Sequence, residues 1–279
     1  MELGVLFGLG SAAAFGAGDF SGGLASRRMS GLTVAGMAQA IGLLALLAVL
    51  AVVRPAPPGA GPLGIAAVAG ICGGIGLVAL YAGLSLGSMG VVTALSGVGS
   101  VALPLLLGYL LGRSPVSPAQ WLGVLVTMAA VGAASGATRH GVQPRAVTLG
   151  LVAAIAFGLW FLLLDLAAEE SGSETWTLVA SRGAATLFIG GAALLRGRYQ
   201  GLRSAWPVVA VAGVMDVAGN GGFVLAASSL PVGVAAALSG IYPIVTMLLA
   251  WAVLRESLPQ LGIAAVLLAV VGIALISLG

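Results

Sequence analysis

Ten apolar runs of about twenty residues each follow one another along the chain, with only short polar segments between them. A helix that crosses the hydrocarbon core of a bilayer needs roughly 20 apolar residues, so each run has the length of one span. Ten spans would occupy about 200 of the 279 residues, which leaves room for loops but not for a separate soluble domain. The expected spans are residues 3–25, 32–53, 63–84, 89–111, 118–137, 146–167, 175–196, 205–227, 232–254 and 259–278.

The composition supports an all-α integral membrane protein whose surroundings are the lipid bilayer. Hydrophobic residues make up 60% of the chain and charged residues only 7%. Soluble domains are about one quarter charged, so a soluble enzyme is excluded, and so is a disordered chain. The net charge of +3 does not indicate a nucleic-acid partner, because arginines in membrane-protein loops face anionic headgroups.

The residue inventory also excludes several kinds of catalytic site. The chain contains no lysine, so it lacks the P-loop of an ATPase and the amine for a Schiff base. The only histidine, His140, lies in a polar segment, whereas zinc proteases of the His-Glu-x-x-His type need two histidines one helical turn apart. We therefore expect no enzymatic activity, no cofactor and no metal site.

Two weak breaks leave the number of spans open at two points. Only residues 87–90 separate the third and fourth runs, and only residues 228–231 separate the eighth and ninth. Re-entrant segments are the alternative there. Because the two breaks recur at matching positions in the two halves, we expect tight hairpins between full spans.

An internal repeat divides the chain into two halves. Residues 8–16 and 150–158 are identical at six of nine positions at an offset of 142, and residues 94–97 recur as 237–240 at an offset of 143. Each half holds five spans, an odd number, so the second half must enter the membrane in the opposite orientation. We expect two inverted five-helix domains, residues 1–138 and 146–279. Inverted repeats are typical of secondary transporters that bind substrate between the repeats near the bilayer midplane.

Three segments of the chain have a characteristic sequence: residues 15–28, 238–243 and 254–257. In these segments the chain resembles the EamA-type ten-helix branch of the drug/metabolite transporter superfamily. The first half departs from the pattern, with Ser100 in place of Pro243 and Arg113 in place of Glu256. The resemblance implies transport of small metabolites or drugs through a cavity between the halves, lined mainly by helices 1, 3, 4, 6, 8 and 9.

Three charged residues lie well inside predicted spans: Asp19, Arg182 and Asp216. Ionisable groups at membrane depth are costly and point to a transport pathway or a proton relay. Arg182 and Asp216 are expected to pair, and such a pair serves either structure or transport. For Asp19 the alternatives are a role in transport and an ion pair with Arg27 or Arg28.

Several uncharged residues complete the candidate site. Asn220 lies four residues after Asp216, on the same helix face. Pro104 and Pro243 are candidate hinges, because proline loosens a helix. The further candidates for substrate contact or coupling are Tyr81, Ser96, Trp160, Ser239 and Tyr242.

These features predict a secondary transporter that exports a small metabolite by alternating access, with a proton or another ion as the candidate coupling partner. The alternatives are an exporter of lipophilic cations and a non-transporting membrane sensor or assembly protein. The loops between spans place eight arginines on one side of the membrane and two on the other. Positively charged loops stay in the cytoplasm, so both termini are expected outside it, in the cell (inner) membrane of a bacterium.

Overall fold

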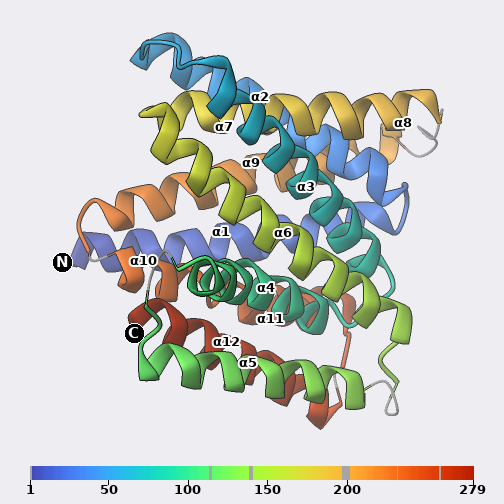
Figure 1. Ribbon diagram of the computed structural model, residues 1–279. Helices are drawn as coiled ribbons and strands as arrows, with labels where there is room; N and C mark the ends of the chain where they lie inside the picture. Colours follow the sequence, from blue (N-terminus) through green and yellow to red (C-terminus); the bar gives the residue numbers. More distant parts are fainter. Residues whose placement is uncertain (1, 113–114, 138–140, 197–201, 231, 258) are drawn as a thin grey trace.

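The computed structural model describes residues 2–112, 115–137, 141–196, 202–230, 232–257 and 259–279. Every regular element in this part of the chain is a helix, and no strand occurs in it. The helices, shown in Figure 1, are α1 (Glu2–Ser26), α2 (Gly31–Val53), α3 (Ala60–Ser85), α4 (Met89–Leu110), α5 (Pro118–Ala137), α6 (Pro144–Ser171), α7 (Glu174–Ala185), η2 (Thr186–Gly190), α8 (Gly191–Leu195), α9 (Leu202–Ala227), α10 (Val232–Ser239), α11 (Tyr242–Leu254) and α12 (Gln260–Leu278).

The predicted all-α integral membrane fold is confirmed. Within the described ranges, nine helices are long and apolar enough to cross a membrane, and α5 is a further apolar helix. The seventh span comprises α7, a short π-helix η2 and α8, which follow one another without a break. Large apolar side chains such as Leu195 (91% exposed) and Val52 (83% exposed) point outward. Such surfaces are unfavourable in water and favourable against lipid tails.

Each of the two weak breaks lies between two successive helices, as expected. Between α3 and α4 the chain reverses at Gly87 and Ser88, whose φ angles are +96° and +56°. These left-handed conformations produce a tight turn. At the second break α9 ends at Ala227 and α10 begins at Val232, while Pro231 lies outside the described residues.

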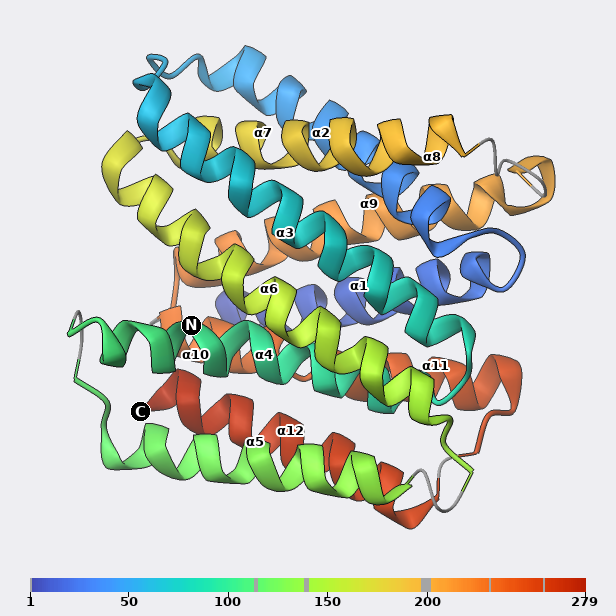
Figure 2. The same cartoon turned by 45° about the vertical axis from the view of Figure 1, so that its right-hand side comes forward.

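The two halves pack against each other in an inverted arrangement. α1 packs on α9 of the second half, and α6, the repeat equivalent of α1, packs on α3 of the first. α2 packs on α7, and α5 packs on α12, so these two pairs join equivalent helices. Figures 1 and 2 show that α1 and α6 cross the molecule in opposite directions. The odd number of spans in each half explains this reversal.

Glycines at equivalent positions in the two halves pack against aromatic rings that are also at equivalent positions. A Cβ added at Gly76 in α3 would lie 2.8 Å from the ring of Phe157, and one added at Gly219 in α9 would lie 2.6 Å from the ring of Phe15. Phe15 and Phe157 belong to the repeated segment found in the sequence. The repeat therefore reflects a shared packing requirement, because a helix accepts a bulky ring this closely only where it has no Cβ.

The ninth span is not the continuous helix expected over residues 232–254. It is divided into α10, which ends at Ser239, and α11, which begins at Tyr242. Pro243 lies in the first turn of α11, where its missing N–H costs no hydrogen bond. Pro104, by contrast, lies inside α4, which continues past it.

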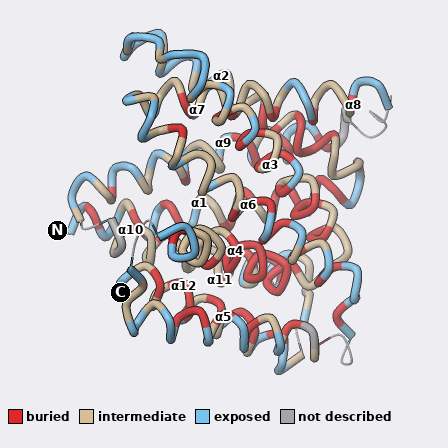
Figure 3. The backbone as a smooth tube through the Cα atoms, in the orientation of Figure 1, coloured by how far each residue is buried: buried red, intermediate tan, exposed pale blue. Residues whose placement is uncertain are grey.

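Burial is greatest where helices of the two halves cross. Figure 3 shows buried positions gathered along α4 and the inner part of α3, whereas the outer end of α2 is exposed. Small residues dominate this interior, including Ala66, Ala69 and Ala154. Small side chains let helix backbones approach closely, and this packing drives association where no hydrophobic effect acts between helices.

We predict that Gly99→Ala will destabilise the protein, because an added Cβ would collide with the backbone of Ala154 in α6. Overpacking of this kind costs about 1–3 kcal/mol, so the melting temperature in detergent should fall. Gly132→Ala is the matched control, since a Cβ there meets nothing within 4 Å. Its stability should be unchanged or raised, because alanine favours helix more than glycine does. Equal effects of the two changes would contradict the described contact between α4 and α6.

Candidate functional site

A cavity of about 190 Å³ lies between the two halves. Residues from both repeats form its walls, and most of them lie near the middle of their helices. The lining residues are Phe15, Asp19, Gln39, Gly70, Gly73, Leu77, Leu80, Ser100, Phe157, Trp160, Phe161, Ser181, Arg182, Ala185, Asp216, Asn220 and Tyr242.

The second and seventh spans contribute more to this cavity than the family resemblance implied. Gln39 of α2 and Ser181, Arg182 and Ala185 of α7 all line it. α2 and α7 are one of the two pairs of equivalent helices that pack against each other across the boundary between the halves. Their side chains therefore reach the cavity from the boundary between the halves.

Arg182 is bonded to two polar side chains at the cavity wall. It forms the expected ion pair with Asp216, and its Nη1 donates a hydrogen bond of 2.8 Å to Oε1 of Gln39. At the repeat offset of 143, Gln39 is the equivalent of Arg182, so the two equivalent positions bond to each other across the interface. The Nδ2 of Asn220 donates to the main-chain carbonyl of Asp216 at 2.7 Å, within α9. Both charges of this wall are thus bound to protein partners.

Asp19 is in a different environment. Its half-buried side chain lines the cavity from α1, and within the described part of the chain it makes no hydrogen bond and no ion pair. Arg27, one of its two candidate partners, lies 3.8 Å from the carboxylate of Glu256 instead. Asp19 therefore presents an uncompensated carboxylate to the cavity.

Aromatic rings form much of the remaining wall. The rings of Phe15 and Tyr242 meet edge to face, with centroids 6.1 Å apart and an interplanar angle of 63°. On the α6 side, the rings of Trp160 and Phe161 have centroids 4.5 Å apart. The indole Nε1 of Trp160 donates to Oγ of Ser181 at 3.0 Å, so its polar edge is satisfied within the protein. The faces of these rings offer an apolar surface with a negative electrostatic potential.

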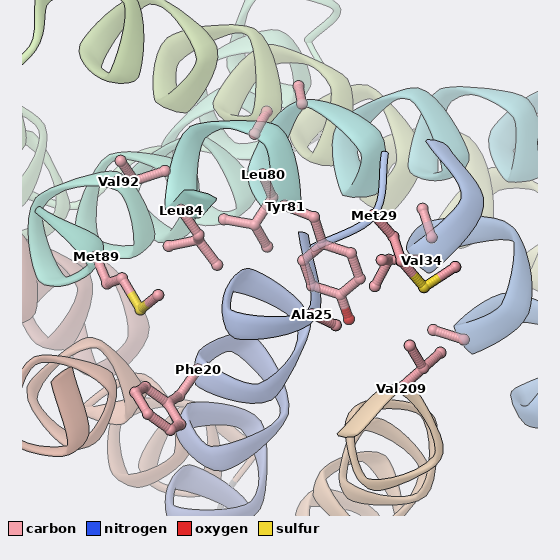
Figure 4. Packing of buried hydrophobic residues seen from close by; sticks show 14 of the residues in the cluster. Phe20, Ala25, Met29, Val34, Leu80, Tyr81, Leu84, Met89, Val92 and Val209 are labelled. Atoms are coloured by element: carbon pink, nitrogen blue, oxygen red, sulfur yellow. The ribbon is translucent and has the colours of Figure 1, made fainter. Parts of the chain in front are cut away.

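Three of the candidates for substrate contact or coupling lie outside the cavity lining: Tyr81, Ser96 and Ser239. Tyr81 is only 2% exposed and belongs to the buried hydrophobic cluster that also contains Phe20, Leu84 and Met89, part of which is drawn in Figure 4. Tyr81 is therefore a core residue rather than the cavity wall expected from the sequence. Ser96 is buried in α4, where its Oγ donates to the main-chain carbonyl of Thr93 at 2.8 Å.

Ser239 lies at the end of α10, next to the break in the ninth span. It is 6% exposed, and its Oγ has no hydrogen-bond partner among the described residues. Of the two hinge candidates, Pro243 adjoins this break. Pro104 lines a neighbouring hollow between α4 and α6. Arg113, the counterpart of Glu256 in the first half, lies outside the described residues.

The sequence analysis did not identify Gln39, Ser181 or Glu256 as site residues. The sequence did contain a signal for Gln39, because the repeat offset of 143 makes this residue the equivalent of Arg182. Glu256 lies after α11, and its carboxylate accepts hydrogen bonds from the main-chain N–H groups of Ser88 and Met89 at the start of α4. A carboxylate is favourable there because the helix N-terminus carries partial positive charge.

The arrangement suits reversible binding of a small molecule. The cavity combines a few convergent polar groups with apolar and aromatic walls, the usual composition of a ligand site. In the described residues, no group of three or more His, Cys, Asp or Glu side chains is placed to hold a metal ion.

We predict energetic coupling between Arg182 and Asp216. Arg182→Ala leaves the Asp216 carboxylate without its cation in a partly desolvated site, so it should lower stability in detergent by on the order of 2 kcal/mol. The double change Arg182→Ala with Asp216→Ala should recover part of this loss. A double-mutant cycle from thermal melts measures the coupling, and strict additivity would show that the pair contributes nothing to stability.

Comparison with known proteins places the chain in a family. Its sequence matches the model of the EamA-like transporter family twice, over residues 2–135 and over residues 144–278. No curated protein matches the sequence. One solved structure, described only as "Crystal structure of protein", superposes with a TM-score of 0.58 and 16% identity. The alignment covers 99% of this chain and 97% of that one, and at this identity it concerns the fold alone. Because the two family matches together span nearly the whole chain, the protein belongs to the EamA-like transporter family and is a multi-pass membrane transporter of small solutes.

Proposed function

We propose that this transporter is a secondary exporter of a small polar or amphipathic metabolite and that it works by alternating access. The observation that carries the proposal is the cavity whose walls come from both repeats. In this mechanism the two halves, residues 1–138 and 146–279, rock against each other and expose the cavity to one side of the membrane at a time.

Contacts at one end of the bundle support such gating. Glu256 of the second half holds the start of α4 in the first half, and Arg27 at the end of α1 lies beside the same carboxylate. These contacts tie the halves together at the end where α1 and α11 finish. These contacts are few and partly buried, and a hydrogen bond contributes only about 1 kcal/mol net once the bonds regained with water are counted, so a gate of this kind can open within a transport cycle.

Toward the other end, a second hollow adjoins the central cavity. It lies between α4 and α6 and shares Ser100 and Phe161 with the cavity. Asp165 and Glu169 near the end of α6 also line it. We propose that this hollow is the path by which the transported solute leaves the cavity.

The energy source is proposed to be an ion or substrate gradient. The chain has no lysine and hence no P-loop with which to use a nucleotide, and we assign it no enzymatic activity. Asp19 is the candidate coupling group, because a carboxylate at membrane depth is unfavourable unless it meets a cation or takes up a proton.

We predict that transport depends on the carboxylate of Asp19 whereas folding does not. Asp19→Asn keeps the shape of the side chain and removes its charge, so it should abolish most flux and its pH dependence while leaving the melting temperature near that of the wild type. The measurement is uptake of labelled amino acids, nucleosides, sugars and amines by sealed proteoliposomes. Glu170→Gln, a change at an exposed residue, is the control and should transport normally.

Normal transport by Asp19→Asn across the pH range would remove Asp19 from the coupling mechanism. Absence of flux for every class of solute with the wild-type protein would favour a non-transporting sensor or assembly protein.

Both chain termini are predicted to lie outside the cytoplasm, in the cell membrane of a bacterium. Arg27, Arg28, Arg145, Arg196 and Arg255 lie at helix ends that the span order assigns to one side. Arg54 follows α2 on the opposite side. The predicted spans assign three further arginines to the same side. The structure does not describe Arg139, Arg198 or the side chain of Arg203. A reporter fused to the C-terminus should be active only outside the cytoplasm, and cytoplasmic activity would reverse the orientation.

A further inference from the structure

The charged residues of the cavity do not balance. Asp19, Arg182 and Asp216 line it, so acidic groups exceed basic ones by one. The guanidinium of Arg182 is bound to Asp216 and Gln39. Asp19 is left without a partner among the described residues. The cavity therefore complements a positively charged ligand rather than an anion, which would have to displace Asp216 from Arg182.

The two repeats differ at the position of this acid. Phe15 and Asp19 are four residues apart on α1, so they share one helix face. The equivalent face of α6 carries Phe157 and Phe161, which also line the cavity. One wall thus presents a carboxylate where the equivalent position on the other presents a benzene ring. A ligand that satisfies both walls has a charged end and an apolar end.

We propose that the cavity binds an amphipathic organic cation in one orientation, with its charged group at Asp19 on α1 and its apolar group against Phe157 and Phe161 on α6. The proposal rests on the proposed transport function and names the class of solute. The ring of Phe15, one turn from Asp19 and in edge contact with Tyr242, supplies an aromatic wall beside the charged group. Cations are attracted to the faces of such rings within about 6 Å of the centroid.

Other ligand classes fit these walls less well. A neutral solute offers no charge to pair with the Asp19 carboxylate, so that group either stays uncompensated in a partly desolvated cavity or takes up a proton, and in neither case does its charge contribute to binding. A small inorganic cation compensates the charge but leaves the rings of α6 without an apolar partner. The two walls together therefore favour a molecule that carries both a positive charge and an apolar group.

Three ligands with the same phenylmethyl group test the charge preference. They are benzyltrimethylammonium, which is cationic, N,N-dimethyl-2-phenylacetamide, which is neutral, and phenylacetate, which is anionic. Calorimetric titration of the purified full-length protein in detergent measures their affinities. We expect the cation to bind at least about tenfold more tightly than the other two. Equal or tighter binding of the neutral or anionic ligand would overturn the proposal without the need for any variant.

Two variants test the orientation. Asp19→Asn should remove the preference for benzyltrimethylammonium over the neutral ligand, and Asp19→Glu should retain it. Phe161→Ala should reduce the advantage of benzyltrimethylammonium over tetramethylammonium, which has the same charge and no ring. Glu170→Gln, at an exposed position, should bind all four ligands as the wild type does. An unchanged charge preference in a folded Asp19→Asn protein would contradict the assignment of the charged end.

Binding and flux measurements together distinguish a failure of this proposal from a failure of the proposed transport function. Flux of neutral or anionic solutes in proteoliposomes, without binding of the cation, would leave the transport function in place and reject the ligand class. Binding of the cation through Asp19, without flux of any solute, would leave the site in place and reject transport.

Discussion

The hydrocarbon core of the membrane is the constraint on which the rest of this structure depends. Because no water is present there to bond with the main chain, each span must satisfy its own backbone groups, and helices do so. The described part of the chain accordingly consists of helices and short connections. Helix association must then come from close packing, which explains why glycines such as Gly76 and Gly219 stand where aromatic rings cross.

Against this apolar background, a small number of polar contacts define the centre of the molecule. Arg182 bonds to its repeat equivalent Gln39 and pairs with Asp216, so its charge is held within the protein. Asp19 has no such partner in the described residues and opens into the cavity. The two acids of the cavity therefore differ in their surroundings, since Asp216 is paired with Arg182 and Asp19 has no cation beside it among the described residues.

The inverted repeat supplies a symmetric scaffold, and local substitutions make it asymmetric. Phe15 and Phe157 occupy equivalent places against equivalent glycines. One turn further along, Asp19 of the first half corresponds to Phe161 of the second. The ninth span is broken before Pro243, whereas α4 is continuous at Ser100, its counterpart. The two halves therefore share their helix packing and differ in the side chains that they present to the cavity.

The sequence by itself determined the fold class, the spans and the inverted repeat, since apolar length and repeated packing motifs are local properties of the chain. It also identified Arg182 and Asp216 as partners, because two opposite charges at membrane depth have few alternatives. Only the tertiary structure decided which polar and aromatic residues share the cavity: it placed Tyr81 in the core, brought Gln39 to Arg182, and paired Arg27 with Glu256 rather than with Asp19. The physical reason is that the rotation of each helix about its axis decides which of its side chains face the cavity. In a helix that is apolar on all sides, no periodic pattern in the sequence indicates this rotation.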